Sequence, residues 1–388
     1  MKSSKPQFDG QGVKLGDVAT YINGYAFKPA DYSLNGKQII RIQDLTGNAY
    51  QTNNFAGELD DKYLVSSGDV LISWSASLGV FEWNKEEAWL NQHIFKVVFN
   101  KLPVDKRYFI HQARYVINRG AMLAHGATMR HLTKKVFESL PFSYPNRSEQ
   151  LTIAKRLDDI QRQIYLAEKQ ISKLDSLVKS RFVEIFGDFA CYETKPLIKC
   201  VDCIEAGKSP KCLAFSRKMA EPGVLKLSAI SSGVYCENEN KALPRSVSLT
   251  IDKVVHANDI LLSRKNTPEL VGRSVLVKHT DGNIMFPDII FRMHPLPPIN
   301  AMYLSYLLAG PLLHSIQSLA HGSAKSMSNI PKSELAKLSI PIPALNLQNE
   351  FANFVSQVDK SRFGGMLHLL NSLSGIMHAS FFSVADTD

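Results

Sequence analysis

A long stretch from Ser148 to Phe186 carries apolar residues at alternating steps of four and three, the 3.5-residue period of a coiled-coil seam. No Pro or Gly interrupts it, and Gly187 follows directly, as is typical after the end of a helix. At about 1.5 Å per residue this helix would measure roughly 55–60 Å. Its polar faces leave a narrow apolar stripe, which favours a partner helix over the alternative of a core helix in one domain. The stripe consists of Ile153, Leu157, Ile160, Ile164, Ala167, Ile171, Leu174, Val178 and Ile185.

The chain also repeats itself on either side of this stretch. Residues 39–50 (IIRIQDLTGNAY) match residues 224–235 (VLKLSAISSGVY) in length and in the order of apolar, basic and hydroxyl positions. Residues 66–73 (SSGDVLIS) match residues 256–263 (HANDILLS), and from Leu140 onwards the offset between the copies is constant. A repeat of this length indicates a duplicated domain together with the helix that follows it.

The second copy therefore predicts a second long helix, over 347–384, that supplies a partner for the first stripe. Two helices that leave similar domains bury each other's stripes most simply as an antiparallel pair. A double Gly at 364–365 costs roughly 1–2 kcal/mol relative to Ala, so we expect a kink there. The sequence predicts a mixed α/β (α+β) protein in which the domains 1–147 and 188–346 are followed by the helices 148–187 and 347–384 respectively.

The length, charge and apolar content of the chain limit the classes of function that it can have. A chain of 388 residues is too long for one ordinary core, which agrees with two domains. Forty-five Lys and Arg against 36 Asp and Glu give a net charge of +9, which favours an anionic partner such as nucleic acid. The N-terminus lacks an apolar signal core and no window approaches 18 uninterrupted apolar residues, so we expect a cytoplasmic protein without membrane contact.

The sequence offers no convincing catalytic or metal site. Five cysteines fit reduced thiols, and the Cys200–Cys203 pair lacks the second close pair of a zinc site. Residues 202–209 (DCIEAGKS) imitate a phosphate-binding loop, but Asp202 replaces the first Gly and Pro210 would obstruct the following helix. Residues 239–241 (ENK) have a nuclease-like ExK spacing, yet no Asp on a preceding strand accompanies them, so we expect a solvated turn. Motifs of methyltransferases, zinc proteases and serine hydrolases do not occur.

The repeated motifs, in their order, resemble the DNA specificity subunits of type I restriction-modification systems. The resemblance is carried by KLGDVATYINGYAFK, GDVLISWSASLGVF and NDILLSRKNTPELVGR, by the HGAT and HGSAKSMSNI loops, by LPFSYPNRSEQ and LSIPIPALNLQ, and by KSRFVEIFGDF. It covers essentially the whole chain and implies two tandem target-recognition domains, each followed by a spacer helix. The start of the second copy, PLIKCVDCIEAGKSP, departs from the pattern because it matches KLGDVATYINGYAFK only loosely.

This resemblance implies a non-catalytic subunit that recognises a bipartite, asymmetric target in double-stranded DNA. Such subunits direct two adenine methyltransferase (modification) subunits, docked on the spacer helices, and ATP-dependent endonuclease (restriction, translocase) subunits. The resemblance implies no cofactor on this chain, with S-adenosylmethionine, ATP and Mg²⁺ on the partner subunits. Two alternatives stay open, a coiled-coil scaffold that binds no DNA and a stand-alone nuclease that uses Glu239 and Lys241.

The loops that follow the repeated strands are the candidate DNA-binding elements, because a shared scaffold there carries different residues. Arg, Lys, Asn, Ser and Thr are common donors to bases and phosphates. After the two buried strands the candidates are Trp74, Ser75 and Ser77 in the first copy and Arg264, Lys265, Asn266 and Thr267 in the second. The Gly loops add Thr128, Arg130 and His131 in the first copy and Lys325, Ser326 and Asn329 in the second.

Overall fold

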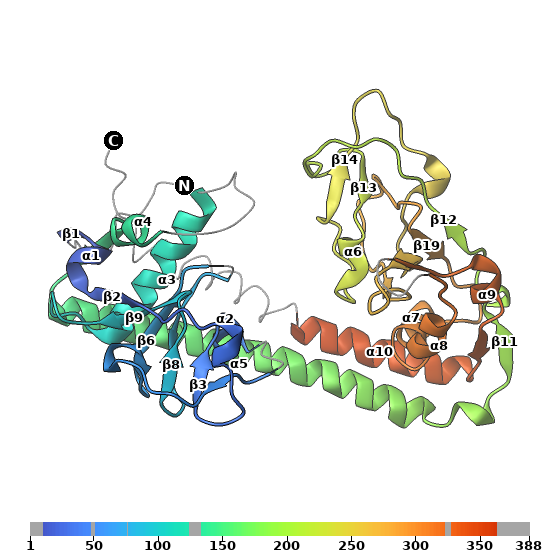
Figure 1. The fold of residues 1–388 in the computed structure, drawn as a ribbon. Helices are drawn as coiled ribbons and strands as arrows, with labels where there is room; N and C mark the ends of the chain where they lie inside the picture. Colours follow the sequence, from blue (N-terminus) through green and yellow to red (C-terminus); the bar gives the residue numbers. More distant parts are fainter. Residues whose placement is uncertain (1–10, 48–50, 76, 124–132, 323–326, 363–388) are drawn as a thin grey trace. The chain divides into compact units, whose positions relative to one another are not determined.

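The computed structural model describes residues 11–47, 51–75, 77–123, 133–322 and 327–362 (Figure 1). These residues form two compact units, and the division between them falls inside the long helix α5 (Arg147–Phe186), between Gln170 and Ile171. We call the described residues up to Gln170 unit 1 and those from Ile171 to Arg362 unit 2. Each unit contains part of α5, so each builds its own core against a section of that helix.

Unit 1 contains two four-stranded sheets and one antiparallel ribbon. The main sheet consists, in spatial order, of β2 (Thr20–Asn23), β9 (Ile94–Val98), β6 (Val70–Ser73) and β7 (Gly79–Glu82), all antiparallel. The second sheet consists of β4 (Asn54–Phe55), β3 (Lys37–Ile40), β8 (Ala88–Leu90) and β5 (Leu64–Val65), with β3 parallel to β8. The ribbon pairs β1 (Gln11–Lys14) with β10 (Pro141–Tyr144). The helices before α5 are α1 (Leu15–Val18), α2 (Ile42–Thr46), α3 (Lys106–Leu123) and α4 (Lys134–Glu138).

Unit 2 repeats the strand order of the main sheet, and its second sheet has three strands instead of four. Its main sheet consists of β12 (Glu205–Ala206), β19 (Ile290–Met293), β15 (Ile260–Ser263) and β17 (Ser274–Leu276). The second sheet consists of β14 (Asn240–Ala242), β13 (Gly223–Leu225) and β18 (Ile284–Met285), with β13 parallel to β18. Two ribbons pair β11 (Thr194–Pro196) with β21 (Ser339–Pro341) and β16 (Lys265–Asn266) with β20 (Ser328–Asn329). The helices after α5 are α6 (Ser228–Ser231), α7 (Ala301–Ala309), α8 (Leu313–Ser318), α9 (Lys332–Ala336) and α10 (Leu345–Ser361).

The predicted duplication is confirmed by this shared strand order. The repeated segments form equivalent strands, since β3 corresponds to β13, β6 to β15 and β9 to β19. All four residues of both β6 and β15 are buried, which explains why these strands read as continuous apolar runs rather than alternating ones. The loosely matching start of the second copy occupies an equivalent place as well, because β12 pairs with β19 as β2 pairs with β9.

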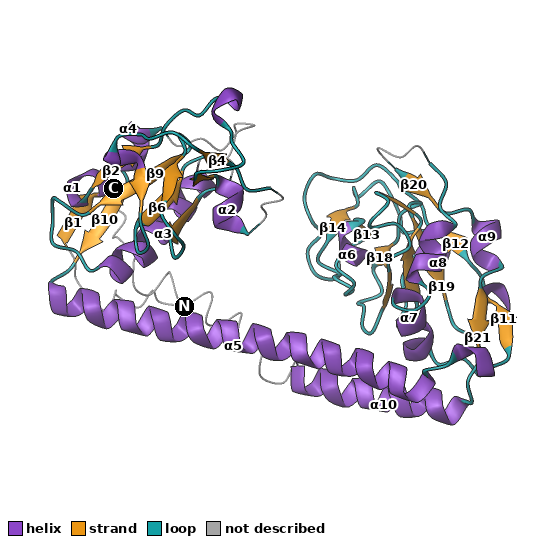
Figure 2. Cartoon of the chain, turned by 60° about the horizontal axis from the view of Figure 1, so that its bottom comes forward, coloured by secondary structure: helices purple, strands orange, loops and turns teal. Residues whose placement is uncertain are grey.

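The last part of α5 packs against α10 within unit 2 (Figure 2). Phe182 contacts Phe351 edge to face with ring centroids 5.0 Å apart, and both side chains are buried. Arg181 pairs with Glu350, whereas Asp175, which lies earlier on α5, pairs with Arg362 beyond the end of α10. The two helices therefore run antiparallel, as predicted.

Two details of the helix prediction need correction or fall outside the described residues. In the first turns of the seam, Ile153 and Leu157 are buried in unit 1's own core with the side chain of Tyr108. Because the junction between β10 and α5 is short, the first turns of α5 pack directly against the domain that precedes them. The second helix begins at Leu345, before the predicted 347, and the predicted portion from residue 363 to 384, including the double Gly, lies outside the described residues.

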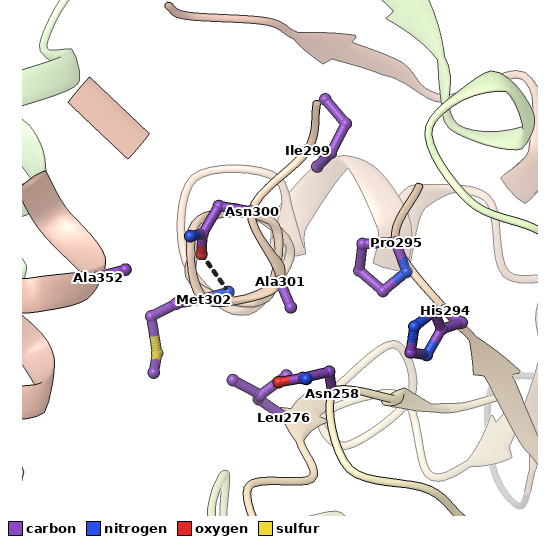
Figure 3. A pocket seen from close by; sticks show the side chains of 9 residues that line it. All are labelled: Asn258, Leu276, His294, Pro295, Ile299, Asn300, Ala301, Met302 and Ala352. Atoms are coloured by element: carbon purple, nitrogen blue, oxygen red, sulfur yellow. Dashed lines mark hydrogen bonds between the residues drawn. The ribbon is translucent and has the colours of Figure 1, made fainter. Parts of the chain in front are cut away.

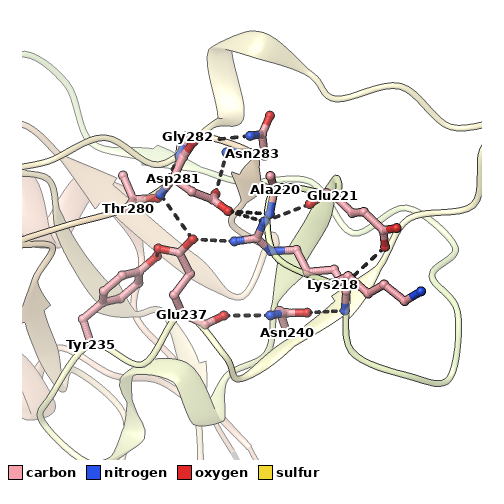
Figure 4. Close-up of polar contacts among 11 residues, drawn as sticks. Lys218, Ala220, Glu221, Tyr235, Glu237, Asn240, Thr280, Asp281, Gly282 and Asn283 are labelled. Atoms are coloured by element: carbon pink, nitrogen blue, oxygen red, sulfur yellow. Dashed lines mark hydrogen bonds and ion pairs between the residues drawn. The ribbon is translucent and has the colours of Figure 1, made fainter.

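A buried arginine organises the loop before β13 in unit 2. The guanidinium of Arg217 pairs with Glu237 and with Asp281, the latter at 2.6 Å, and only 5% of the Arg217 side chain is exposed. Figure 4 shows Glu237 and Asp281 side by side, where the Asp281 backbone N–H donates to the Glu237 carboxylate at 3.3 Å. The hydrogen bond from the Arg217 guanidinium holds the pKa of Asp281 well below its usual range. One cation therefore ties three loop segments of unit 2 together.

Candidate nucleic-acid interface

In unit 2, the loop after the buried strand lies beside the described part of the second Gly loop. The loop after the buried strand β15 forms β16, in which Lys265 pairs with Asn329 and Asn266 pairs with Ser328 of β20. The backbone N–H of Ile330 also donates to the Arg264 carbonyl at 3.0 Å. The structure thus joins the described part of the second Gly loop to the loop that follows β15.

A turn before β19 completes this edge of the sheet. The backbone N–H groups of Arg264 and Lys265 donate to the Ile289 carbonyl at 2.9 and 3.2 Å. The neighbouring Asp288 accepts a hydrogen bond from the Ser209 hydroxyl and pairs with the Lys265 ammonium at 3.7 Å. Sequence reasoning missed Asp288 and Ser209, because neither lies in a loop that directly follows a repeated buried strand.

The four candidates in residues 264–267 differ in their accessibility. The Arg264 guanidinium lies over the Phe291 ring at 5.2 Å and donates to the Asp288 carbonyl at 3.4 Å, so it is used within the fold. Asn266 is 93% buried, and its amide oxygen accepts from the Thr267 backbone N–H at 2.9 Å. Lys265 is half-buried and Thr267 is exposed. Lys265 and Thr267 are therefore the accessible members of this loop.

Unit 1 has a corresponding edge with different side chains. The backbone N–H of Trp74 donates to the His93 carbonyl at 3.4 Å, as that of Arg264 does to Ile289. The Trp74 ring stacks on Phe95 with centroids 5.8 Å apart, which makes it mainly a packing residue. Ser75 is buried, whereas Ser77 is exposed and its carbonyl accepts from the Ser73 hydroxyl.

The remaining candidates fall on parts of the chain that the structure does not describe. They are Thr128, Arg130 and His131 in the first Gly loop and Lys325 and Ser326 in the second. Asn329 is described, is half-buried, and belongs to β20.

The motifs that imitate catalytic sites have ordinary structural roles. Asn240 and Lys241 belong to strand β14, which corrects the expectation of a turn, and β14 forms because it pairs with β13. The Glu239 carboxylate accepts from Ser228 at 2.6 Å and lies 3.6 Å from the Lys226 ammonium, and these contacts lower its pKa. In the described structure no helix begins directly after Ser209, so residues 202–209 lack the helix N-terminus of a phosphate-binding loop.

A cavity of about 380 Å³ opens beside α7 in unit 2 (Figure 3). His294 lies at its wall and its Nδ1 is 3.0 Å from the buried Asp259 carboxylate. Burial raises the pKa of Asp259. Among the described residues that line the cavity, none is a Ser, Thr, Cys or Lys that could act as a nucleophile.

The described residues contain neither a metal-binding cluster nor a membrane-spanning helix. Within these ranges, no group of three or more His, Cys, Asp and Glu is placed to hold a metal ion. None of the described helices combines the length and apolar character needed to cross a membrane.

Comparison with known proteins links the chain to one family. The model of the type I restriction modification DNA specificity domain matches residues 9–176. The EcoBI specificity subunit of Escherichia coli is 22% identical over 384 residues, which covers 89% of this chain and 78% of that protein. The MjaVIII specificity subunit of Methanocaldococcus jannaschii is 23% identical, with 90% of this chain and 86% of that protein covered.

A solved structure has the same fold along nearly the whole chain. The S subunit of a type I restriction-modification system from M. genitalium matches with a TM-score of 0.52 and 13% identity, covering 98% of both chains. At this identity the match concerns the fold alone, and it agrees with the tandem arrangement of sheets and long helices described above.

Proposed function

We propose that this chain is a DNA specificity subunit of a type I restriction-modification system and that it reads a bipartite, asymmetric DNA target with one half-site for each unit. As a specificity subunit it recognises DNA sequence. Its relatives are named as specificity subunits, and in the proposed complex the chemistry is carried out by partner subunits.

The observation that carries this proposal is a repeated scaffold with unlike residues at its edge. Units 1 and 2 share the strand order of the main sheet, yet the accessible candidates after its buried strand are Ser77 in unit 1 and Lys265 and Thr267 in unit 2. Two copies of one reader with different contact residues would recognise two different sequences, since bases are distinguished by side-chain donors and acceptors. Phosphate contacts from the basic chain would supply most of the affinity.

The helix that joins the two units suits the role of a spacer. α5 is continuous over 40 residues, and we propose that its length fixes the gap between the half-sites. Half-sites on one face of DNA lie about 34 Å apart, or a multiple of that distance. A methyltransferase partner would dock on α5, which exposes the apolar side chains Leu151, Tyr165, Leu166, Leu177 and Val183.

Binding selection tests the proposal. The chain, assembled with its methyltransferase partner, would be given a pool of random DNA duplexes, and the bound fraction would be sequenced. We expect two enriched half-sites of different sequence, separated by a gap of constant length. Enrichment of one contiguous site, or of no sequence, would contradict the proposal. The methyltransferase without this chain is the control and should enrich no such motif.

A further inference from the structure

Gln92 in unit 1 and Asp288 in unit 2 occupy the same place in the repeated scaffold. In unit 1, Ser73 at the end of β6 pairs with Ile94, and in unit 2, Ser263 at the end of β15 pairs with Ile290. A turn precedes each of these isoleucines. In unit 1 the Ile94 N–H closes the turn by donating to the Asn91 carbonyl at 3.0 Å, and in unit 2 the Ile290 N–H donates to the Pro287 carbonyl at 3.1 Å. Gln92 and Asp288 are therefore the second residues of two equivalent turns.

A hydrogen bond from a neighbouring segment holds each of the two turns. The Gln92 N–H donates to the Tyr25 carbonyl at 2.9 Å, and the Asp288 N–H donates to the Ser209 hydroxyl at 3.2 Å. Gly24 packs against the first turn and Gly207 packs next to the second. A Cβ at Gly24 would fall 2.1 Å from the Asn91 carbonyl oxygen, and a Cβ at Gly207 would fall 1.9 Å from the Phe286 carbonyl oxygen. Such close approach requires glycine. The backbone of this position is thus conserved between the two units while its side chain differs.

The two side chains also lie next to the candidate DNA-binding loops. The carbonyl of His93, the residue after Gln92, accepts from the Trp74 N–H. The carbonyl of Ile289, the residue after Asp288, accepts from the N–H groups of Arg264 and Lys265. Gln92 is half-buried, and the side chain of Asp288 is 45% exposed, so both can be reached from solvent.

The chemistry of the two side chains suits different bases. Asp288 presents a hydrogen-bond acceptor beside the donor Lys265, with 3.7 Å between the charged atoms. A cytosine–guanine pair presents the complementary set in the major groove, the N4 amino donor of cytosine next to the O6 and N7 acceptors of guanine. The Gln92 amide, whose Nε2 lies 3.3 Å from the exposed His93 Nε2, carries both a donor and an acceptor, which is the set that pairs with N6 and N7 of adenine.

From this equivalence we infer that residues 92 and 288 determine base specificity, with Asp288 and Lys265 reading one cytosine–guanine pair and Gln92 reading an adenine. The inference rests on the proposed function, because it assigns contacts within the half-sites that the two units would read. Asp288 is thus a recognition residue and not merely a partner that neutralises Lys265.

Variants in the binding selection described above test this inference. Asp288→Asn should reduce the preference for cytosine at one position of one half-site by about tenfold or more, with the other half-site unchanged. Lys265→Met should weaken the preference at the same base pair, and it keeps the test valid if Asp288→Asn fails to fold. Gln92→Glu should replace an adenine preference by a cytosine preference in the opposite half-site. Glu193→Gln, which removes an exposed carboxylate beside the β11 ribbon of unit 2, is the matched control and should change neither half-site.

The outcomes separate the inference from the proposed function. If the unaltered chain selects a bipartite motif and Asp288→Asn strengthens or weakens binding to all sequences equally, Asp288 acts through charge alone and the inference is wrong. The same holds if Asp288→Asn and Lys265→Met change different base pairs. If the unaltered chain selects no motif, the proposed function fails and the inference falls with it.

Discussion

Gln150 and Gln348 make the same pair of hydrogen bonds in the two halves of the chain. The Gln150 amide donates to the Pro145 carbonyl at 2.8 Å and accepts from the Asp105 N–H at 2.8 Å. The Gln348 amide donates to the Pro343 carbonyl at 2.8 Å and accepts from the Asn300 N–H at 2.8 Å. Both glutamines are fully buried. Each long helix is thereby fixed to the start of the domain helix, α3 or α7, that precedes it.

We expect Gln348→Ala to destabilise the folded chain. The substitution leaves the Asn300 N–H and the Pro343 carbonyl without their partner in a buried place, at a cost of about 1–3 kcal/mol for each group. The midpoint of urea unfolding measures the loss. Gln357→Ala, on the exposed side of the same helix, is the control and should change stability by less than about 0.5 kcal/mol. Equal effects of the two substitutions would show that the buried amide bridges contribute nothing.

His111 should make the stability of unit 1 sensitive to acid. Its Nε2 lies 2.7 Å from the Asp158 carboxylate, but burial outweighs this contact and lowers the pKa of His111 below its ordinary 6.5. Above pH 6.5 the imidazole is neutral in the folded and unfolded chain alike. As the pH falls below 6.5, the unfolded chain binds a proton that the folded chain accepts only at a lower pH, so acid favours unfolding.

The corresponding measurement is thermal unfolding between about pH 8 and about pH 5. His111→Gln, which keeps a donor but does not titrate, should have a lower melting temperature at neutral pH and a smaller further decrease in acid. A decrease in acid as steep as that of the unaltered chain would mean that His111 does not contribute to it.

Arg217→Met should destabilise unit 2. It leaves the carboxylates of Glu237 and Asp281, which are 20% and 22% exposed, without their shared cation. Breaking such a buried ion pair from one side costs about 3 kcal/mol. Chemical unfolding of the variant measures the cost, with the exposed Arg245→Met as a control for the loss of one positive charge. Unchanged stability would show that the network is not needed to hold the three segments.

Arg264→Leu separates a structural role from a role in DNA recognition. Because the guanidinium packs on Phe291 and donates to the Asp288 carbonyl, its loss should lower the stability of unit 2 by about 1–2 kcal/mol. The DNA motif obtained by binding selection should stay the same. Lys337→Met, which removes a largely exposed cation from the same unit, should affect neither property. A changed base preference in the Arg264 variant would instead mean that Arg264 contacts DNA.

Most of the fold could be predicted from the sequence because the chain contains two copies of it. The constant offset aligns Gln150 with Gln348, and the structure gives both the same partners. The strands β6 and β15 could be located because complete burial leaves an uninterrupted apolar run. The failure at Lys241 has an equally local reason, since a short polar strand at a sheet edge gives no alternating pattern.

The candidate site was only partly predictable. The loops after β6 and β15 could be selected because they follow recognisable strands, but the pairing of Lys265 with Asn329 is a tertiary contact that no local pattern encodes. The sequence also treats Arg264 and Lys265 alike, whereas the structure uses one cation within the fold and leaves the other accessible. Asp288 could be recognised only from the strand pairing, which gives it the same position in unit 2 that Gln92 has in unit 1.

A map of N6-methyladenine across the genome of cells that express the methyltransferase, with and without this chain, tests the central claim most directly. The account predicts that the chain adds methylation at one bipartite motif, with two unlike half-sites and a constant gap. Methylation that is the same in its presence and absence, although the two proteins form a stable complex, would contradict it.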